Sequence, residues 1–271
     1  MLKLTPEITE DMQELMDEFW PGPLTMVVPA LGIIPKVTTG GLDTVGIRMP
    51  SEPAAAELIS AAETPIAAPS ANLSGKPSPT TYQHVVDDLD GRIDGIIAGG
   101  ECKAGIESTV VDMTEETPVI LRPGVITAEQ LSQALGKTVG IDPALLEKPD
   151  IFNNGGLLQA DASFKPKAPG MKYKHYAPKA EMIIFQGEPE NIKLAMAEEK
   201  MKRNFFGQRV EIIVFDNEYP ETAAHEFFAR LRECDKKNVD VILAAALRED
   251  GIGFAVMNRM FKSAGYNIRE V

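Results

Sequence analysis

The stretch Pro65–Thr81 reads PIAAPSANLSGKPSPTT and is the most informative part of the 271-residue chain. Its opening apolar run, Pro65–Ala68, predicts a buried strand. A polar loop of serines, an asparagine, a lysine and several prolines follows. Because proline fixes φ at about −65°, these polar groups are positioned in advance and lose little entropy on binding. The loop therefore suits the binding of phosphates and a small polar substrate, although its composition alone also fits a solvated surface loop.

The composition narrows the class of protein. Hydrophobic residues make up 44% of the chain and charged residues 25%, as in globular proteins. The net charge of −13 argues against nucleic-acid binding over the whole surface, because phosphate neutralisation needs a basic face. No apolar run approaches the length of a membrane-spanning helix, and the first residues contain no secretory signal. Cys102 and Cys234 lie far apart, which indicates reduced thiols and a cytoplasmic protein.

Hydrophobic periodicity predicts a mixed α/β domain over residues 1–140. The expected helices are residues 7–20, 52–62, 81–88 and 127–135, the last capped by Thr127 with Gln130 at the capping-box position. The expected strands are residues 25–29, 44–47, 65–68, 95–98, 108–112 and 118–121, the last two paired.

A second domain is predicted over residues 181–271. Strands at residues 182–185, 210–215 and 239–244 alternate with helices at 189–203, 222–234 and 254–264. This alternation is typical of a small parallel α/β domain. Residues 141–180 form a linker in which lysines and His175 occur without an acidic residue from Ala162 to Ala180. The basic segment fits a solvated linker or a strap that faces phosphates.

The sequence contains none of the usual catalytic constellations. His84, His175 and His225 are scattered, and no two of them have metal-ligand spacing. A glycine-rich phosphate loop, a dinucleotide fingerprint and a nucleophile elbow are also missing from the sequence. Any chemistry must therefore depend on positioning and charge stabilisation rather than on a strong nucleophile.

Several motifs together resemble one family. In chain order, and in addition to Pro65–Thr81, they are FWPGPLT (19–25), TVGIRMP (44–50), GIESTVVD (105–112), LRPG (121–124), APGMKYKHYAP (168–178) and GIGFAVMNR (251–259). They resemble the long, two-domain form of the threonylcarbamoyl-AMP synthase family, the YrdC-like enzymes of tRNA modification. The resemblance implies a YrdC-like twisted, open mixed sheet with helices, incomplete at its amino terminus, and a small Rossmann-like parallel α/β domain at the carboxyl terminus.

The resemblance also implies a reaction. L-Threonine, bicarbonate (or CO2) and ATP combine into L-threonylcarbamoyl-AMP and pyrophosphate, so the enzyme is a nucleotidyltransferase. Mg²⁺ would accompany ATP. The product would pass to a tRNA threonylcarbamoyl transferase complex, with at most a weak contact to tRNA itself and none to a membrane.

Site residues follow from the same resemblance. Arg48 would pair with the threonine carboxylate, Ala68 would face threonine through its backbone, and Ser108 would reach its polar groups. Tyr176 would lie over the ATP, with the linker as a lid that keeps out water. The residues expected to bind ATP are spread over the motifs: Thr44, Ser70, Asn72, Ser78, Arg122 and Tyr176. The resemblance assigns no catalytic side chain and no metal ligand.

One expected motif has no counterpart. Family members begin with a further stretch that carries Lys-x-Arg, and nothing before Phe19 matches it. We therefore expect the sheet to lack its first strands and this chain alone to make little or no product. The alternative is an inactive nucleotide- or RNA-binding fragment of the same fold. Carbamoyl transfer, as in hydrogenase maturation, fits less well, because those relatives carry zinc-finger and acylphosphatase-like parts that this sequence lacks.

Overall fold

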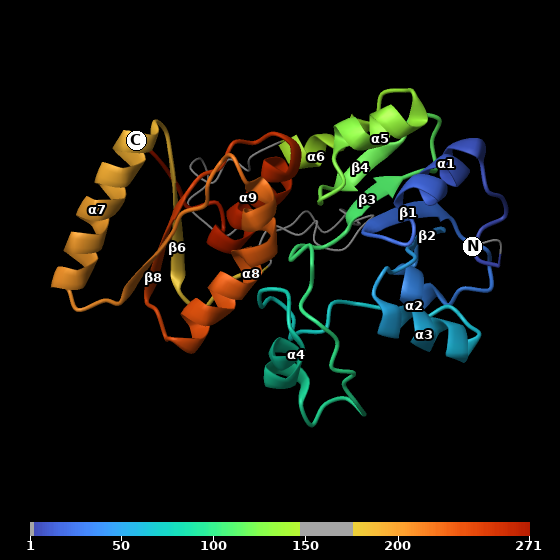
Figure 1. The fold of residues 1–271 in the computed structure, drawn as a ribbon, viewed down its shortest axis with the longest axis horizontal. Helices are drawn as coiled ribbons and strands as arrows, with labels where there is room; N and C mark the ends of the chain where they lie inside the picture. The colour runs from blue at the N-terminus through green and yellow to red at the C-terminus, as the bar shows by residue number, and fades with distance from the viewer. Residues whose placement is uncertain (1–2, 147–175) are drawn as a thin grey trace. The chain divides into compact units, whose positions relative to one another are not determined.

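A computed structural model describes residues 3–146 and 176–271 (Figure 1). Contacts divide these residues into two compact units. Unit 1 contains residues 3–69 and 107–146, and unit 2 contains residues 70–106 and 176–271. Within the described ranges, no helix is both long enough and apolar enough to cross a membrane.

Unit 1 is built on a five-stranded mixed sheet in the order β2-β1-β3-β4-β5. Its strands are β1 (Leu24–Pro29), β2 (Thr44–Ile47), β3 (Thr109–Asp112), β4 (Val119–Arg122) and β5 (Gly140–Ile141). β1 runs antiparallel to β2 and parallel to β3, whereas β3 and β4 are antiparallel. The predicted mixed sheet is therefore confirmed, and so is the pairing of β3 with β4.

The helices of unit 1 are α1 (Glu10–Phe19), α2 (Lys36–Thr39), α3 (Pro53–Ala62), α5 (Ala128–Leu135) and α6 (Pro143–Leu146). Thr9 caps α1, because its hydroxyl accepts from the amide of Met12. Thr127 and Gln130 form the predicted capping box at the start of α5. The short helix α2 was not predicted.

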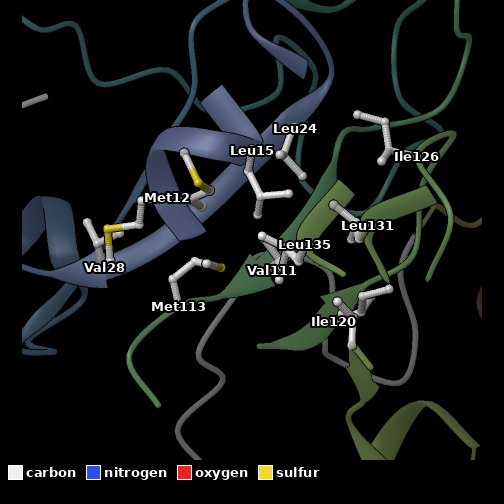
Figure 2. Close-up of a cluster of buried hydrophobic side chains, with 12 residues drawn as sticks. Met12, Leu15, Leu24, Val28, Val111, Met113, Ile120, Ile126, Leu131 and Leu135 are labelled. Atoms are coloured by element: carbon white, nitrogen blue, oxygen red, sulfur yellow. The ribbon is translucent and has the colours of Figure 1, made fainter. Parts of the chain in front are cut away.

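The main core of unit 1 lies between the sheet and two helices. Met12 and Leu15 of α1 point toward Val111 of β3, and Leu131 and Leu135 of α5 lie beside them (Figure 2). Side chains alternate between the two faces of a strand, so the neighbours of these core residues lie on the opposite face. That second face carries a separate small cluster made of Val27, Val110 and Leu121. Both packed helices thus cover the same face of the sheet.

Unit 2 contains a four-stranded sheet in the order β7-β8-β6-β9, in which every pair is parallel. The strands are β6 (Glu181–Gln186), β7 (Val210–Ile213), β8 (Val241–Ala245) and β9 (Ile268–Glu270). The helices are α4 (Tyr82–Leu89), α7 (Pro189–Phe205), α8 (Pro220–Lys236) and α9 (Gly251–Ala264). The predicted parallel α/β domain is confirmed. β9 was missed because it has only three residues, two of them charged.

Two predicted strands are wrong. Pro65–Ala68 and Gly95–Ala98 are irregular and largely exposed, with Ile66 43% and Ile97 63% accessible. The prediction rested on apolar composition, but a strand forms only where a neighbouring strand pairs with it. Within the described residues, neither run has such a neighbour. The preceding helix α3 is likewise exposed, since none of its residues is buried.

Contacts also group residues differently from the predicted domains. Residues 70–106, which the sequence analysis placed in the domain of residues 1–140, belong to unit 2. The reason is close packing on α8. Gly105 has φ +72° and lies so near the backbone of Ala224 and His225 that a Cβ would collide with them. Nearby, the ring nitrogen Nδ1 of His225 lies 3.0 Å from the carbonyl oxygen of Lys103.

Removal of a core side chain tests the packing of unit 1. Leu15 is fully buried, so Leu15→Ala leaves a cavity and is expected to lower the free energy of unfolding by about 2–5 kcal/mol. Urea denaturation measures the change. Glu14→Ala, at an exposed position of the same helix, is the control and should alter stability by less than about 0.5 kcal/mol. Equal effects of the two variants would contradict the assigned orientation of α1.

Candidate functional site

Three of the predicted site residues meet at one end of the unit 1 sheet. Met26 lies opposite Ile47, so the same antiparallel register places Arg48 beside Thr25. The amide of Gly22 donates to the carbonyl oxygen of Met49 at 2.8 Å, which keeps the chain after β2 alongside the start of β1. Arg48 itself is exposed.

Ser108 and Arg122 are joined at this same end. The guanidinium of Arg122 donates from Nε and Nη2 to the Ser108 carbonyl oxygen, at 3.1 and 3.0 Å, and from Nη2 to the Ser108 hydroxyl at 3.0 Å. The Ser108 hydroxyl also lies 2.8 Å from that of Thr25 in β1. A shift of register between Val110 and Val111 accompanies this approach of β4 to β3. The serine hydroxyl, in a residue only 3% exposed, is thus fixed on two sides.

Gly46 lies on the sheet face next to this cluster. Thr44, Gly46 and Arg48 lie on the same face of β2. Gly46 is exposed, and a Cβ there would lie only 3.2 Å from the Thr25 methyl group. Thr44 lies opposite Pro29 and four residues from Arg48, roughly 13 Å along the strand. The structure therefore gathers Arg48, Ser108 and Arg122 and leaves Thr44 at the other end of β2. Ala68 lies in the exposed segment that follows α3.

Ser70, Asn72 and Ser78 lie on one loop of unit 2. The amide of Asn72 donates to the carbonyl oxygen of Ser70 at 3.0 Å. Its side-chain Nδ2 donates to the carbonyl oxygens of Leu73 at 2.9 Å and Lys76 at 3.2 Å, so the loop folds around this amide. The Oδ1 atom is buried and accepts no hydrogen bond from the described part of the chain. Asn72 thus keeps one acceptor for a donor that the loop does not supply.

A buried carboxylate ties this loop to two cations. Asp88 of α4 accepts from Lys76 Nζ and from Arg232 Nη2, both at 2.8 Å, and from the amide of Leu73 at 3.4 Å. Its side chain is 1% exposed and that of Arg232 is 9% exposed. Burial alone would raise the pKa of Asp88, but the hydrogen bonds from Arg232 and Lys76 outweigh it and lower the pKa from 3.8 to about 2.

Arg232 also holds the loop by its backbone. The guanidinium donates to the carbonyl oxygen of Pro77 from Nη2 at 2.7 Å and from Nε at 3.1 Å. Beside it, burial and the charge of Arg232 lower the pKa of His84, whose Nδ1 accepts from the amide of Thr80. These side chains line an open cleft of about 560 Å³. Lys76, Asp88 and Arg232 were not predicted as site residues, because no local pattern links residues 144 positions apart.

Tyr176 is packed rather than exposed. It is 3% accessible, with its ring centroid 5.1 Å from that of Phe228 in α8, and its carbonyl oxygen accepts from the Ser263 hydroxyl at 3.1 Å. The next residue, Ala177, donates its amide to the carbonyl oxygen of Gly75 at 2.9 Å. Of the predicted lid, residues 141–180, residues 147–175 lie outside the described residues. The role of Tyr176 over ATP stays a prediction.

The Asp88 ion pairs predict an acid-dependent stability. Because the pKa of Asp88 is lower in the folded chain, its contribution is complete above about pH 4 and is lost as pH falls toward 2. Asp88→Asn should therefore cost about 2 kcal/mol near neutral pH and about 1 kcal/mol near pH 3. Urea unfolding across this range measures both values.

Asp87→Asn is the matched control, since that carboxylate is exposed and accepts from Gln83 on the helix surface. It should leave the stability nearly unchanged at every pH. A stability difference between the Asp88→Asn variant and the unmodified chain that stays constant from neutral pH to about pH 3 would disprove the proposed linkage.

Comparison with known proteins identifies the family. The family model described as "Telomere recombination" (Sua5, YciO and YrdC) matches residues 1–124, and that described as "Threonylcarbamoyl-AMP synthase, C-terminal domain" matches residues 126–265. The threonylcarbamoyl-AMP synthase of Pyrococcus abyssi is 44% identical over 99% of this chain and 78% of its own length. That of Bacillus subtilis is 41% identical, over 97% and 75%.

The fold agrees with a solved structure. The crystal structure of P. abyssi Sua5 complexed with L-threonine matches with a TM-score of 0.87 at 44% identity, covering 99% of this chain and 78% of that one. Matches of this extent, to both domains and at this identity, carry the assignment without help from any single motif. The chain belongs to the threonylcarbamoyl-AMP synthase family.

Proposed function

We propose that this protein makes L-threonylcarbamoyl-AMP from L-threonine, bicarbonate (or CO2) and ATP, and releases pyrophosphate. The observation that carries the proposal is the cluster of Arg48, Ser108 and Arg122 at one end of the unit 1 sheet, in a chain of this family. The cluster offers an exposed guanidinium beside a fixed hydroxyl. Those groups suit a small molecule with a carboxylate and a hydroxyl, as in threonine.

In this proposal Arg48 binds the carboxylate of threonine. Its planar guanidinium can donate two parallel hydrogen bonds to a carboxylate, which a lysine cannot do. Ser108 contacts the polar groups of threonine, and its hydroxyl is already oriented by Thr25 and Arg122. The backbone at Ala68 completes the threonine contacts.

ATP would be held by Ser70, Asn72 and Ser78 of the polar loop, with Thr44, Arg122 and Tyr176. The Oδ1 atom of Asn72, which accepts no hydrogen bond from residues 3–146 and 176–271, suits a ribose hydroxyl or a water molecule rather than a phosphate oxygen. Mg²⁺ would enter bound to the phosphates of ATP, as part of the substrate.

The substrates supply the reacting groups. The neutral amine of threonine adds to CO2, loses a proton and forms a carbamate. A carbamate oxygen then attacks the α-phosphorus, and the bond from that phosphorus to the bridging oxygen breaks, so pyrophosphate leaves with the electron pair. The protein's own contribution is to bring the reactants together and to stabilise negative charge with Arg48 and Arg122.

The product would be consumed by a tRNA threonylcarbamoyl transferase complex, and any direct contact of this chain with tRNA would be weak. A cytoplasmic location is supported by the two cysteines, which form no disulfide: Cys102 is exposed and Cys234 is buried.

The test is product formation by the protein as its gene encodes it. Incubation with threonine, [¹⁴C]bicarbonate and Mg²⁺-ATP should give a compound that contains both adenosine and the label, with one pyrophosphate for each product. Omission of threonine or of bicarbonate should abolish pyrophosphate release. Nucleotide binding without any labelled adenylate would instead favour the inactive nucleotide-binding alternative.

Arg48→Ala tests the assignment within the site. Loss of the guanidinium leaves the threonine carboxylate unpaired, so we expect threonine affinity to fall by about 30-fold or more, equivalent to about 2 kcal/mol or more. The affinity for ATP should change by less than about threefold. Calorimetric titration measures both. Arg92→Ala, at an exposed arginine outside the cluster, is the control. Threonine affinity equal to that of the unmodified protein would remove Arg48 from the site.

A further inference from the structure

The polar loop is anchored by a residue from far along the chain. Arg232 lies on α8, within the part that matches the carboxyl-terminal family model, whereas its partners Pro77 and Asp88 lie within the part that matches the first one. These contacts span 155 and 144 residues of sequence. All of them lie inside unit 2.

The geometry of the anchor restricts the loop at two points. One is the Pro77 carbonyl oxygen, which accepts two hydrogen bonds from Arg232. The other is Asp88, which accepts from Arg232 while also binding Lys76 and the Leu73 amide. Residues 73–77 are therefore held at both ends. Two carbonyl oxygens of this segment accept hydrogen bonds from the side-chain amide of Asn72, so the anchor also orients Asn72.

A second set of contacts holds α8 in place against the same region. Gly105 packs on the backbone of α8, and the ring of His225 contacts the Lys103 carbonyl oxygen. The segment from Ser70 to Ile106 thus rests on this helix at its start and at its end, which explains why it groups with unit 2. Helix α8, which carries Arg232, is therefore itself held in place by contacts with the segment that contains the loop.

We propose that Arg232 is a positioning residue for nucleotide binding: through Pro77 and Asp88 it fixes the Ser70–Ser78 loop, so helix α8 of the carboxyl-terminal part sets the affinity for ATP. This inference rests on the proposed function, because it requires the loop to bind ATP. Arg232 touches no substrate in this proposal. Its guanidinium fork is needed because one side chain must bind a carbonyl oxygen and a carboxylate at once.

The experiment compares Arg232→Gln with Arg230→Gln. Arg230 lies two residues away on the same helix, where its half-exposed guanidinium is 4.0 Å from Glu226, so it is a matched control. Calorimetry with the α,β-methylene analogue of ATP and, separately, with threonine gives the two affinities. We expect Arg232→Gln to weaken nucleotide binding by about tenfold or more and threonine binding by less than about twofold. Arg230→Gln should change neither.

Hydrogen exchange gives a readout that does not depend on ligand. Peptides that cover residues 72–80 should exchange faster in Arg232→Gln, whereas peptides from β6 should be unchanged. Arg232→Lys, which can bind Pro77 or Asp88 but not both in the same way, should fall between the two in exchange and in nucleotide affinity. It also provides the test if Arg232→Gln does not fold.

The outcomes separate this inference from the proposed function. Nucleotide binding by the unmodified protein that Arg232→Gln and Arg232→Lys retain in full would overturn the positioning role alone. Equal losses of threonine and nucleotide affinity would also overturn it, since they indicate general damage to the fold. Absence of nucleotide binding by the unmodified protein would overturn the proposed function and this inference together.

Discussion

A single buried carboxylate organises the part of the molecule that the polar loop depends on. Asp88 is almost inaccessible to solvent, and a charge in that position is tolerated only because Arg232 and Lys76 both bind it. The two cations come from different parts of the sequence, so the pair joins the loop after Asn72 to helix α8. Arg232 also donates to the carbonyl oxygen of Pro77, so the loop is held to α8 at two points.

The candidate site of unit 1 contains an exposed charge instead of a buried one. This charge, on Arg48, lies beside the hydroxyl of Ser108, which is held by hydrogen bonds. Helices α1 and α5 pack on one face of the unit 1 sheet, and the end of β2 on the other face carries Arg48. The guanidinium of Arg122 donates hydrogen bonds to Ser108. These bonds orient the serine hydroxyl rather than activate it as a nucleophile. This arrangement fits a reaction in which the substrates bring the reactive groups and the protein contributes geometry and positive charge.

The features that could be predicted from the sequence are those that depend on residues close together along the chain. The Thr127–Gln130 capping box, the paired strands β3 and β4 and the parallel sheet of unit 2 follow from spacing of a few residues. Arg48, Ser108 and Arg122 were found through their motifs. The run Pro65–Ala68 was predicted as a strand because composition cannot show whether a pairing partner is present. The Asp88–Arg232 contact could not be predicted, because no short-range pattern reports a pair separated by 144 residues.

The central claim is that the bond formed to the α-phosphorus of ATP comes from a carbamate oxygen of threonine. The most direct measurement is phosphorus NMR of the product made from [¹⁸O]bicarbonate. We expect an isotope shift of the α-phosphorus signal, because the bridging oxygen comes from the carbamate, and we expect unlabelled pyrophosphate. Label in the pyrophosphate, or an α-phosphorus signal with no isotope shift, would contradict it.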